Sequence, residues 1–324
     1  MAQKIIIGAK DLCMHFPVTG SLGQKNGVTK AVDGVNLSVY QGETLGLVGE
    51  SGCGKTTLGR TLLRLYRPSS GKILFDGQDI TNLSDKKLRP LRAQMTCVFQ
   101  DPFNSLDPRK TVGSIVGEPL KIHKLVKNRS EYRERVEQLF QFVNLDPAMA
   151  TRYPHEFSGG QRQRIAIARS LASSPRFVVC DEAVAALDVS IQAQIINLLM
   201  DIRERMDITY LFISHDLGVV RHISDRIAVL YLGRVVELAE SDELYRQPQH
   251  PYTKALLSAV PIPDPFTDQM REEIFLQGEV PSPQSPPTGC HFHPRCPYAT
   301  EACAAEVPRL RDIGNGHQVA CHHV

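Results

Sequence analysis

The sequence has no long apolar run and almost no excess of charge of either sign. A membrane-spanning helix needs about 18 or more consecutive apolar residues, and no stretch approaches that length, so we expect that the chain does not cross a membrane. The apolar run at residues 5–7 is far too short for a secretory signal peptide. The formal net charge of +2 predicts no broad surface for nucleic acid. These absences predict a cytosolic location.

Cysteine is unevenly distributed along the 324 residues. Cys13, Cys53, Cys97 and Cys180 are single and scattered, whereas four others crowd into residues 290–321. Because a reducing compartment disfavours disulfides, the second group predicts a metal site. The apolar content of 42% gives room for a full α/β domain with a smaller appendage.

A glycine-rich loop at residues 49–56, GESGCGKT, follows an apolar run at 44–48 that predicts a buried strand. Such a loop lets backbone N–H groups surround the phosphates of a nucleotide, with a helix N-terminus behind them. Lys55 would contact the β- and γ-phosphates, and the Thr56 hydroxyl would bind Mg²⁺. A chance glycine-rich turn is the alternative. The predicted nucleotide contacts are Gly49, Glu50, Ser51, Gly52, Cys53, Gly54, Lys55, Thr56 and Thr57.

An acidic pair, Asp181 and Glu182, follows a second apolar strand at residues 177–180. We expect Asp181 to hold Mg²⁺ through water, opposite Thr56, and Glu182 to polarise the attacking water. Hydrolysis needs both, because charge accumulates on the γ-phosphoryl oxygens. Alone, such a pair is often only a turn, but the loop at 49–56 favours the functional interpretation.

A second corner of small residues precedes a predicted helix and comprises Ser158, Gly159, Gly160 and Gln161. Small residues at a helix N-terminus can bind an anion. Ser158 could instead serve only as the N-cap of that helix. Two phosphate-binding corners on one chain favour the first interpretation.

These motifs, in this order, resemble those of ATP-binding cassette (ABC) proteins over residues 10–240, and FSGGQ at 157–161 resembles their LSGGQ signature. The resemblance implies further roles: Gln100 in the Q-loop and as a Mg²⁺ ligand with Thr56 and Asp181, Asp188 in the D-loop, His215 as the switch histidine, and Phe16 stacked on adenine. Gln100 could instead be a loop amide, and His215 a strand cap. For Phe16, a place in the core is equally favoured.

The expected fold is an α/β P-loop NTPase with a RecA-like parallel sheet. Alternating residues at 5–40 predict an N-terminal antiparallel β subdomain with an exposed loop at 19–28. Strands at 177–180, 208–213 and 227–230 alternate with helices at 161–173, 189–205 and 216–223, which predicts a parallel sheet covered by helices.

The expected domains are a nucleotide-binding domain at 1–260 and a C-terminal extension at 261–324. The first contains a helical subdomain at about 101–160, whose segment 129–145 is amphipathic. The resemblance implies that this subdomain meets a coupling helix of a membrane subunit, although its amphipathic helix could equally be packed core. Prolines concentrated at 261–289 predict an extended linker.

The chain departs from the family where a proline and a Ser or Thr usually follow the acidic pair. Ala183 and Ala185 stand there. We expect hydrolysis to persist because both acids are present. Without the proline the backbone after Glu182 is less restrained, which would loosen the position of the base and reduce turnover.

The family resemblance implies that one chain does not hydrolyse ATP alone. A nucleotide on the loop at 49–56 would be completed by the signature corner of another subunit, so Ser158 and Gly160 would serve a partner's nucleotide. A site with donors on all sides of the γ-phosphate needs that second face.

Several strings resemble a narrower group, the ATPases of bacterial dipeptide, oligopeptide and nickel importers; the most restrictive is HPYTKALL at 250–257. ALDVSIQAQ resembles the second ("F"-type) of their two ATPases. The implied partners are a paralogous ATPase, two transmembrane permease subunits and an extracytoplasmic binding protein, but no nucleic acid. The implied location is peripheral, on the cytoplasmic face of the bacterial inner membrane. Short peptides are the expected solutes, with nickel or another solute as the alternative.

The crowded cysteines are Cys290, Cys296, Cys303 and Cys321. Four thiolates can hold a [4Fe–4S] cluster or one tetrahedral Zn²⁺. The spacing lacks the tight C-x₂-C pairs of common zinc ribbons, and the importer resemblance implies the cluster. Five nearby histidines keep zinc as the alternative, and four free thiols are the third.

Two other classes of protein fit less well. A soluble cassette protein acting on ribosomes or DNA usually carries two cassettes or a long inserted coiled coil, and this chain has neither. A P-loop kinase or GTPase would not need the corner at 157–161, and the guanine-reading N-K-x-D pattern is absent.

Overall fold

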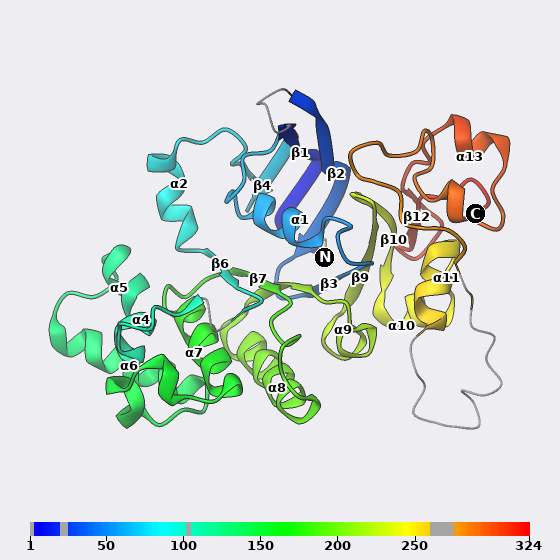
Figure 1. Cartoon of the computed structure of the whole chain (residues 1–324). Coiled ribbons are helices and arrows are strands. Elements are labelled where there is room, and N and C mark those ends of the chain that lie inside the picture. Colours follow the sequence, from blue (N-terminus) through cyan, green and yellow to red (C-terminus); the bar gives the residue numbers. More distant parts are fainter. Residues whose placement is uncertain (1–2, 20–24, 102–104, 260–273, 275) are drawn as a thin grey trace.

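The computed structural model describes residues 3–19, 25–101, 105–259, 274 and 276–324. Its centre is an eight-stranded sheet with the order β11-β12-β10-β9-β3-β8-β7-β6, and a four-stranded sheet with the order β2-β1-β4-β5 lies beside it (Figure 1). The eight strands are β3 (Thr44–Val48), β6 (Met95–Val98), β7 (Phe177–Asp181), β8 (Thr209–Ile213), β9 (Arg226–Tyr231), β10 (Arg234–Glu240), β11 (Arg311–Asp312) and β12 (Gln318–Val319). The five strands β6, β7, β8, β3 and β9 pair in parallel, as the sequence predicts.

The central strands are short and apolar because both faces of the sheet are covered. Every residue of β3, β7 and β8 is buried. Successive residues of a strand point to opposite faces, and in β7 Val178 and Cys180 belong to one hydrophobic core while Phe177 and Val179 belong to the other. The sheet therefore separates two cores.

Different helices cover the two faces. Helix α1 (Lys55–Leu62) packs against β1, β2, β7 and β8. Helices α7 (Gly159–Leu171), α8 (Val189–Met206) and α9 (Leu217–Ile223) contribute to the other core. The predicted alternation of strands and helices after residue 158 is thus confirmed.

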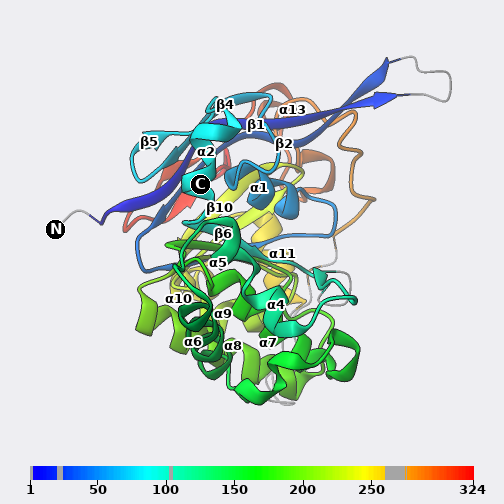
Figure 2. The ribbon, with the colours of Figure 1, turned by 90° about the vertical axis from the view of Figure 1, so that its left-hand side faces the viewer.

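The four-stranded sheet is antiparallel and is formed by β1 (Ile5–Thr19), β2 (Lys25–Tyr40), β4 (Ser70–Phe75) and β5 (Gln78–Asp79). This confirms the antiparallel prediction for residues 5–40. The β1–β2 hairpin reaches away from the rest of the molecule (Figure 2). The predicted loop at 19–28 is shorter, because β2 already begins at Lys25; residues 20–24 lie outside the described part of the chain.

A group of helices lies between β6 and α7, at the lower left of Figure 1. It comprises α4 (Val112–Val116), α5 (Glu118–Ile122), α6 (Arg129–Phe142) and the 3₁₀ turns η1 (Pro147–Thr151) and η2 (Pro154–Glu156). Helix α2 (Asp85–Arg92) precedes β6 and lies outside this group, above it in Figure 1. Asn128 caps α6 by accepting a hydrogen bond from the Glu131 N–H. The buried face of α6 carries Val136, Leu139 and Phe140. Residues 102–104 of the expected helical subdomain lie outside the described part.

The C-terminal part contains α10 (Ser241–Arg246), α11 (Pro251–Ser258), the 3₁₀ turn η3 (His293–Arg295) and α13 (Glu301–Ala305). It joins the main sheet, because β12 pairs with β10 and Glu237 lies opposite Val319. The Glu237 carboxylate is fully buried and 2.7 Å from His317 Nε2. Of the predicted linker at 261–289, residues 261–273 and 275 lie outside the described part. Within the described residues, no helix combines the length and apolarity that a membrane span requires.

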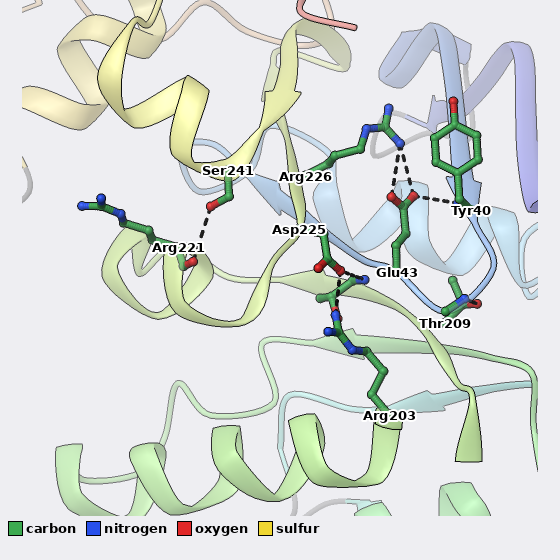
Figure 3. Close-up of polar contacts among 10 residues, drawn as sticks. Tyr40, Glu43, Arg203, Thr209, Arg221, Asp225, Arg226 and Ser241 are labelled. Carbon is green, nitrogen blue, oxygen red and sulfur yellow. Dashed lines mark hydrogen bonds and ion pairs between the residues drawn. The ribbon is translucent and has the colours of Figure 1, made fainter. Parts of the chain in front are cut away.

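Charged side chains hold the amino ends of β3 and β9 (Figure 3). Asp225 Oδ2 accepts hydrogen bonds from the Thr44 N–H at 2.7 Å and from Arg203 at 2.6 Å. Arg226 pairs with Glu43 at 3.2 Å. These contacts fix the start of β3 and so the position of the loop that follows its other end.

Candidate nucleotide-binding site

The loop at 49–56 connects β3 to α1 and passes very close to neighbouring backbone. Gly49 and Gly54 have positive φ angles of 149° and 108°. A Cβ atom at Gly49 would lie 2.1 Å from the Leu230 carbonyl oxygen, and one at Gly54 would lie 2.0 Å from that of Ala31. Only glycine fits at either position.

Lys55 is the first residue of α1, and its side chain folds back over the loop. Its Nζ donates to the carbonyl oxygens of Gly49 at 2.8 Å and Glu50 at 3.0 Å. The residue is 5% exposed, so the ammonium group is already withdrawn from solvent inside the loop. Thr57 continues α1, and its carbonyl accepts a hydrogen bond from the Thr61 hydroxyl.

Thr56 and Asp181 meet beside this loop. The Thr56 hydroxyl donates to Asp181 Oδ1 at 2.7 Å. Asp181 Oδ2 is buried without a hydrogen-bond partner, and Arg60 lies 3.6 Å from it. Burial raises the pKa of the Asp181 carboxyl. A hydroxyl beside a carboxylate oxygen without a partner is a donor set that suits Mg²⁺.

Three polar side chains converge at the carboxyl ends of the parallel strands. Gln100 Nε2 donates to Glu182 Oε2 at 2.7 Å, and His215 Nδ1 lies 3.6 Å from Glu182 Oε1. Glu182 has a φ of 48°, and its N–H donates to the Ile213 carbonyl at 3.0 Å. The backbone of Glu182 is thus held in an uncommon conformation between Gln100 and His215.

The aromatic residue Phe16 lies in β1, half-buried. Its ring meets that of Tyr66 edge to face, with centroids 5.5 Å apart. The ring contributes to the core on one side and remains partly accessible.

The residues at 158–161 begin α7, and Asp188 begins α8. Ser158 and Gln161 form a reciprocal capping box, in which the Gln161 N–H donates to Ser158 Oγ and the Ser158 N–H donates to Gln161 Oε1. Asp188 caps α8 by accepting from the Ile191 N–H at 3.0 Å. Within the described residues, no hydrogen bond or ion pair joins 158–161 to the loop at 49–57.

Three residues near the loop were missed by sequence reasoning. Arg60 lies four residues after Thr56 on α1, a helical spacing that could have indicated it. Arg295 contacts the Glu50 carboxylate at 2.8 and 3.1 Å, and the Tyr252 hydroxyl accepts the Glu50 N–H at 2.9 Å. These two residues lie far from Glu50 in the sequence, so no local pattern points to them.

The four tail cysteines lie in one part of the fold. Burial raises the pKa of the Cys290 thiol to about 11, and the nearby thiols of Cys303, Cys321 and Cys296 add to the shift. The Cys290 N–H donates to the Cys303 carbonyl at 2.8 Å. In the described residues, one group of three potential ligand atoms lies within 4.8 Å of one another, and it is Cys13, His15 and Asp33.

In the part of the chain that the structure describes, no three of the four tail sulfur atoms lie within 4.8 Å of one another. Zinc–sulfur bonds of about 2.3 Å place neighbouring thiolates roughly 3.8 Å apart. The group at Cys13 is also unsuited to a cation, because Asp33 is already paired with Arg234 at 2.6 Å and with His15 at 3.1 Å.

Comparisons with known proteins agree with this geometry. Residues 32–185 match the family model "ABC transporter", and residues 236–303 match "Oligopeptide/dipeptide transporter, C-terminal region". The oligopeptide transport ATP-binding protein AppF of Bacillus subtilis (strain 168) is 55% identical over 99% of this chain and 98% of its own length. A putative peptide import ATP-binding protein of Brucella ovis is 50% identical over 99% of this chain and 98% of its own length.

Solved structures show the same fold. The ATP-binding cassette MJ0796, a dimer bound to ADP and Pi, aligns with a TM-score of 0.65 and 28% identity, over 72% of this chain and 98% of that one. CbiO1 from Clostridium perfringens aligns with a TM-score of 0.65 and 29% identity, over 76% of this chain and 92% of that one. This chain belongs to the family of ABC transporter ATP-binding proteins, in the group that carries the oligopeptide/dipeptide transporter C-terminal region.

Proposed function

We propose that this protein is the ATPase subunit that powers import of dipeptides or oligopeptides across the bacterial cytoplasmic membrane. The observation that carries the proposal is the convergence of Thr56 with Asp181, and of Gln100 and His215 with Glu182, at the end of one parallel sheet. The printed names of full-length relatives support peptides as the solute. Nickel or another solute is the alternative.

ATP binding uses the loop at 49–57. Its N–H groups and the α1 N-terminus receive the phosphates, while Lys55 exchanges its bonds to loop carbonyls for bonds to phosphate oxygens. Thr56, Gln100 and Asp181, the last through water, would hold Mg²⁺, which neutralises charge on the phosphates. Phe16 would stack on the adenine.

Hydrolysis uses Glu182 as the general base. Gln100 and His215 lie on either side of its carboxylate, so both can orient it and the attacking water. His215 would also contact the γ-phosphate. Each of these side chains follows a different strand, which sets their spacing through the sheet.

Residues Ser158, Gly159, Gly160 and Gln161, with Asp188, would act on a partner's nucleotide. The capped α7 N-terminus presents donors with no contact to the loop of its own chain, which suits an interface role. The proposed partner is a paralogous ATPase, in a heterodimer like the dimer reported for MJ0796.

The membrane subunits would dock near Gln100. A cavity of about 830 Å³ between the central sheet and the helical group is lined by residues that include Phe99, Gln100, His123 and Arg169. Movement of the helical group would therefore reach Gln100 directly. We propose that two transmembrane permeases and an extracytoplasmic binding protein complete the importer, with this chain peripheral on the cytoplasmic face of the membrane.

We also propose a [4Fe–4S] cluster held by Cys290, Cys296, Cys303 and Cys321, with Zn²⁺ as the alternative. The support for this proposal is that the four thiols gather in one part of the fold, close enough for Cys303, Cys321 and Cys296 to add to the burial that raises the pKa of Cys290. The cluster would have a structural or sensory role. Anaerobically purified protein is expected to contain iron and to show broad brown absorption; an iron-free, zinc-loaded sample would support the alternative.

The catalytic proposal is tested with Glu182→Gln in the assembled complex. This change removes the base and keeps the shape of the side chain, so ATP hydrolysis should fall by at least about 100-fold while ATP still binds. Exposed Glu204→Gln on α8 is the matched control and should hydrolyse ATP normally. Normal turnover by Glu182→Gln would show that the base lies elsewhere.

A further inference from the structure

The phosphate loop is attached to the C-terminal part of the chain through Glu50. The Arg295 guanidinium contacts both Glu50 carboxylate oxygens, with N–O distances of 2.8 and 3.1 Å. The Glu50 N–H donates to the Tyr252 hydroxyl at 2.9 Å. Both the side chain and the backbone of this loop residue are therefore held from outside the loop.

The ion pair between Arg295 and Glu50 is largely shielded from water. The Arg295 side chain is 8% exposed and that of Glu50 is 27% exposed. A two-pronged guanidinium–carboxylate contact fixes orientation as well as distance. Shielding also makes this contact stronger than an exposed pair.

The turn that carries Arg295 is itself anchored in the core. Phe292 is 1% exposed, and its ring packs against those of Tyr231, Tyr252 and His250 with centroids 5.2 to 5.5 Å apart. The 3₁₀ turn η3 (His293–Arg295) follows directly, so Arg295 extends from a fixed base toward the loop.

The loop needs such an anchor because its glycines allow the backbone many conformations. Gly49, Gly52 and Gly54 all have positive φ angles, and glycine loses the most conformational freedom when it is ordered. A loop that is ordered before ATP arrives avoids that entropy cost on binding.

We propose that Arg295, with Tyr252, is a positioning residue that presets the phosphate loop, so that the C-terminal extension sets the affinity of the chain for ATP. The proposal rests on the ATPase function proposed above. It implies an effect on ATP binding and little effect on the chemical step, because neither residue reaches Thr56, Asp181 or Glu182.

The test measures the KM for ATP and kcat of the assembled complex, together with MgATP binding to the full chain by calorimetry. Arg295→Ala should raise the KM and the Kd for ATP about tenfold, equivalent to about 1.4 kcal/mol, with kcat within about twofold of wild type. Arg295→Lys keeps the positive charge but not the two-pronged contact, so its affinity for ATP should lie between that of Arg295→Ala and that of the wild type. Exposed Arg309→Ala, in the same extension, is the matched control.

A double-mutant cycle separates positioning from a general structural role. If Arg295 acts through Glu50, Arg295→Ala should weaken ATP binding no further in a Glu50→Ala background. A further loss there would overturn the proposal. Tyr252→Phe retains the packed ring and removes only the acceptor for the Glu50 N–H, so it should also raise the KM. If Arg295→Ala fails to fold, Arg295→Lys takes its place in the cycle and Tyr252→Phe remains a separate test of the KM.

The outcome also distinguishes the two proposals. If the wild-type complex does not hydrolyse ATP, the proposed function fails. If it does, and Arg295→Lys and Tyr252→Phe both keep the wild-type KM, only the positioning role fails.

Discussion

Asp181, which we propose to hold Mg²⁺, lies in an environment that disfavours its charge. It is 1% exposed, one carboxylate oxygen lacks a hydrogen-bond partner, and burial raises its pKa. A raised pKa means that the folded state disfavours the ionised carboxylate. The contribution of this group to the free energy of unfolding therefore falls as the pH rises from the unfolded pKa through the folded one. The proposed Mg²⁺ would offset this cost, because a divalent cation favours the ionised carboxylate.

Asp181→Asn should therefore stabilise the protein while removing activity. Near neutral pH, we expect the free energy of unfolding without nucleotide to rise by up to about 1 kcal/mol, because a buried charge is lost. Mg²⁺-dependent hydrolysis should fall at least about 100-fold. Urea denaturation and ATPase assays check both effects.

Exposed Asp201→Asn on α8 is the control for the charge change. A variant Asp181→Asn that is less stable than wild type would show that attraction to Arg60 outweighs burial.

The residues of the candidate site could be predicted from the sequence where they lie close together along the chain. Gly49 to Thr57 form a contiguous pattern, and Ser158 with Gln161 has the spacing of a capping box. The contact of Arg295 with Glu50 joins residues 245 apart, so only the folded chain brings them together.

Elements were predictable where apolar runs are short and bounded. The expected strand at 177–180 corresponds to β7 (Phe177–Asp181), and the helix at 189–205 to α8 (Val189–Met206). The pairing of β12 with β10 was not predicted, because a strand of two residues is too short to show the alternation of apolar and polar residues that indicates a strand.

The ionic contacts of Asp76 link the two sheets and predict a pH effect. Asp76 follows β4 and contacts both Lys4 and Arg176 at 2.7 Å. Hydrogen bonds from Arg176 and Lys4 lower the pKa of Asp76 to about 2. The folded state therefore favours the ionised form, and this stabilisation is complete above about pH 4 and lost as the pH falls toward 2.

Asp76→Asn should reduce stability above pH 4 by about 0.5–1 kcal/mol, a modest effect because the pair is partly solvated. Asparagine tolerates the left-handed backbone at this position, where φ is 48°. Unfolding curves measured from pH 2 to 7 should converge with those of wild type near pH 2. A constant difference across that range would indicate a backbone effect.

At the scale of the whole molecule, the two corners proposed to bind nucleotide lie apart in the described part of one chain. The loop at 49–57 and the α7 N-terminus at residues 158–161 share no hydrogen bond or ion pair among the described residues. This separation supports the proposal that a second subunit brings the two corners together around one nucleotide.

Ser158→Asp tests this arrangement. Aspartate is a good N-cap, so α7 should remain intact, but its charge should repel a nucleotide held by the partner. We expect unchanged ATP binding to the isolated chain and at least about a tenfold loss of hydrolysis in the assembled heterodimer. Ser158→Asn, a neutral cap, is the control. Weaker ATP binding to the isolated Ser158→Asp chain would place the corner on its own nucleotide.

The incorporation of β12 into the main sheet has a consequence for biosynthesis. The sheet contains strands from Thr44 to Val319, and the buried Glu237 meets His317 only when that last strand docks. During translation, a nascent chain that has not yet released residue 319 from the ribosome lacks this strand and leaves Glu237 without its histidine. Prematurely terminated products should therefore be recognised by cellular proteases before they compete for places in a transporter.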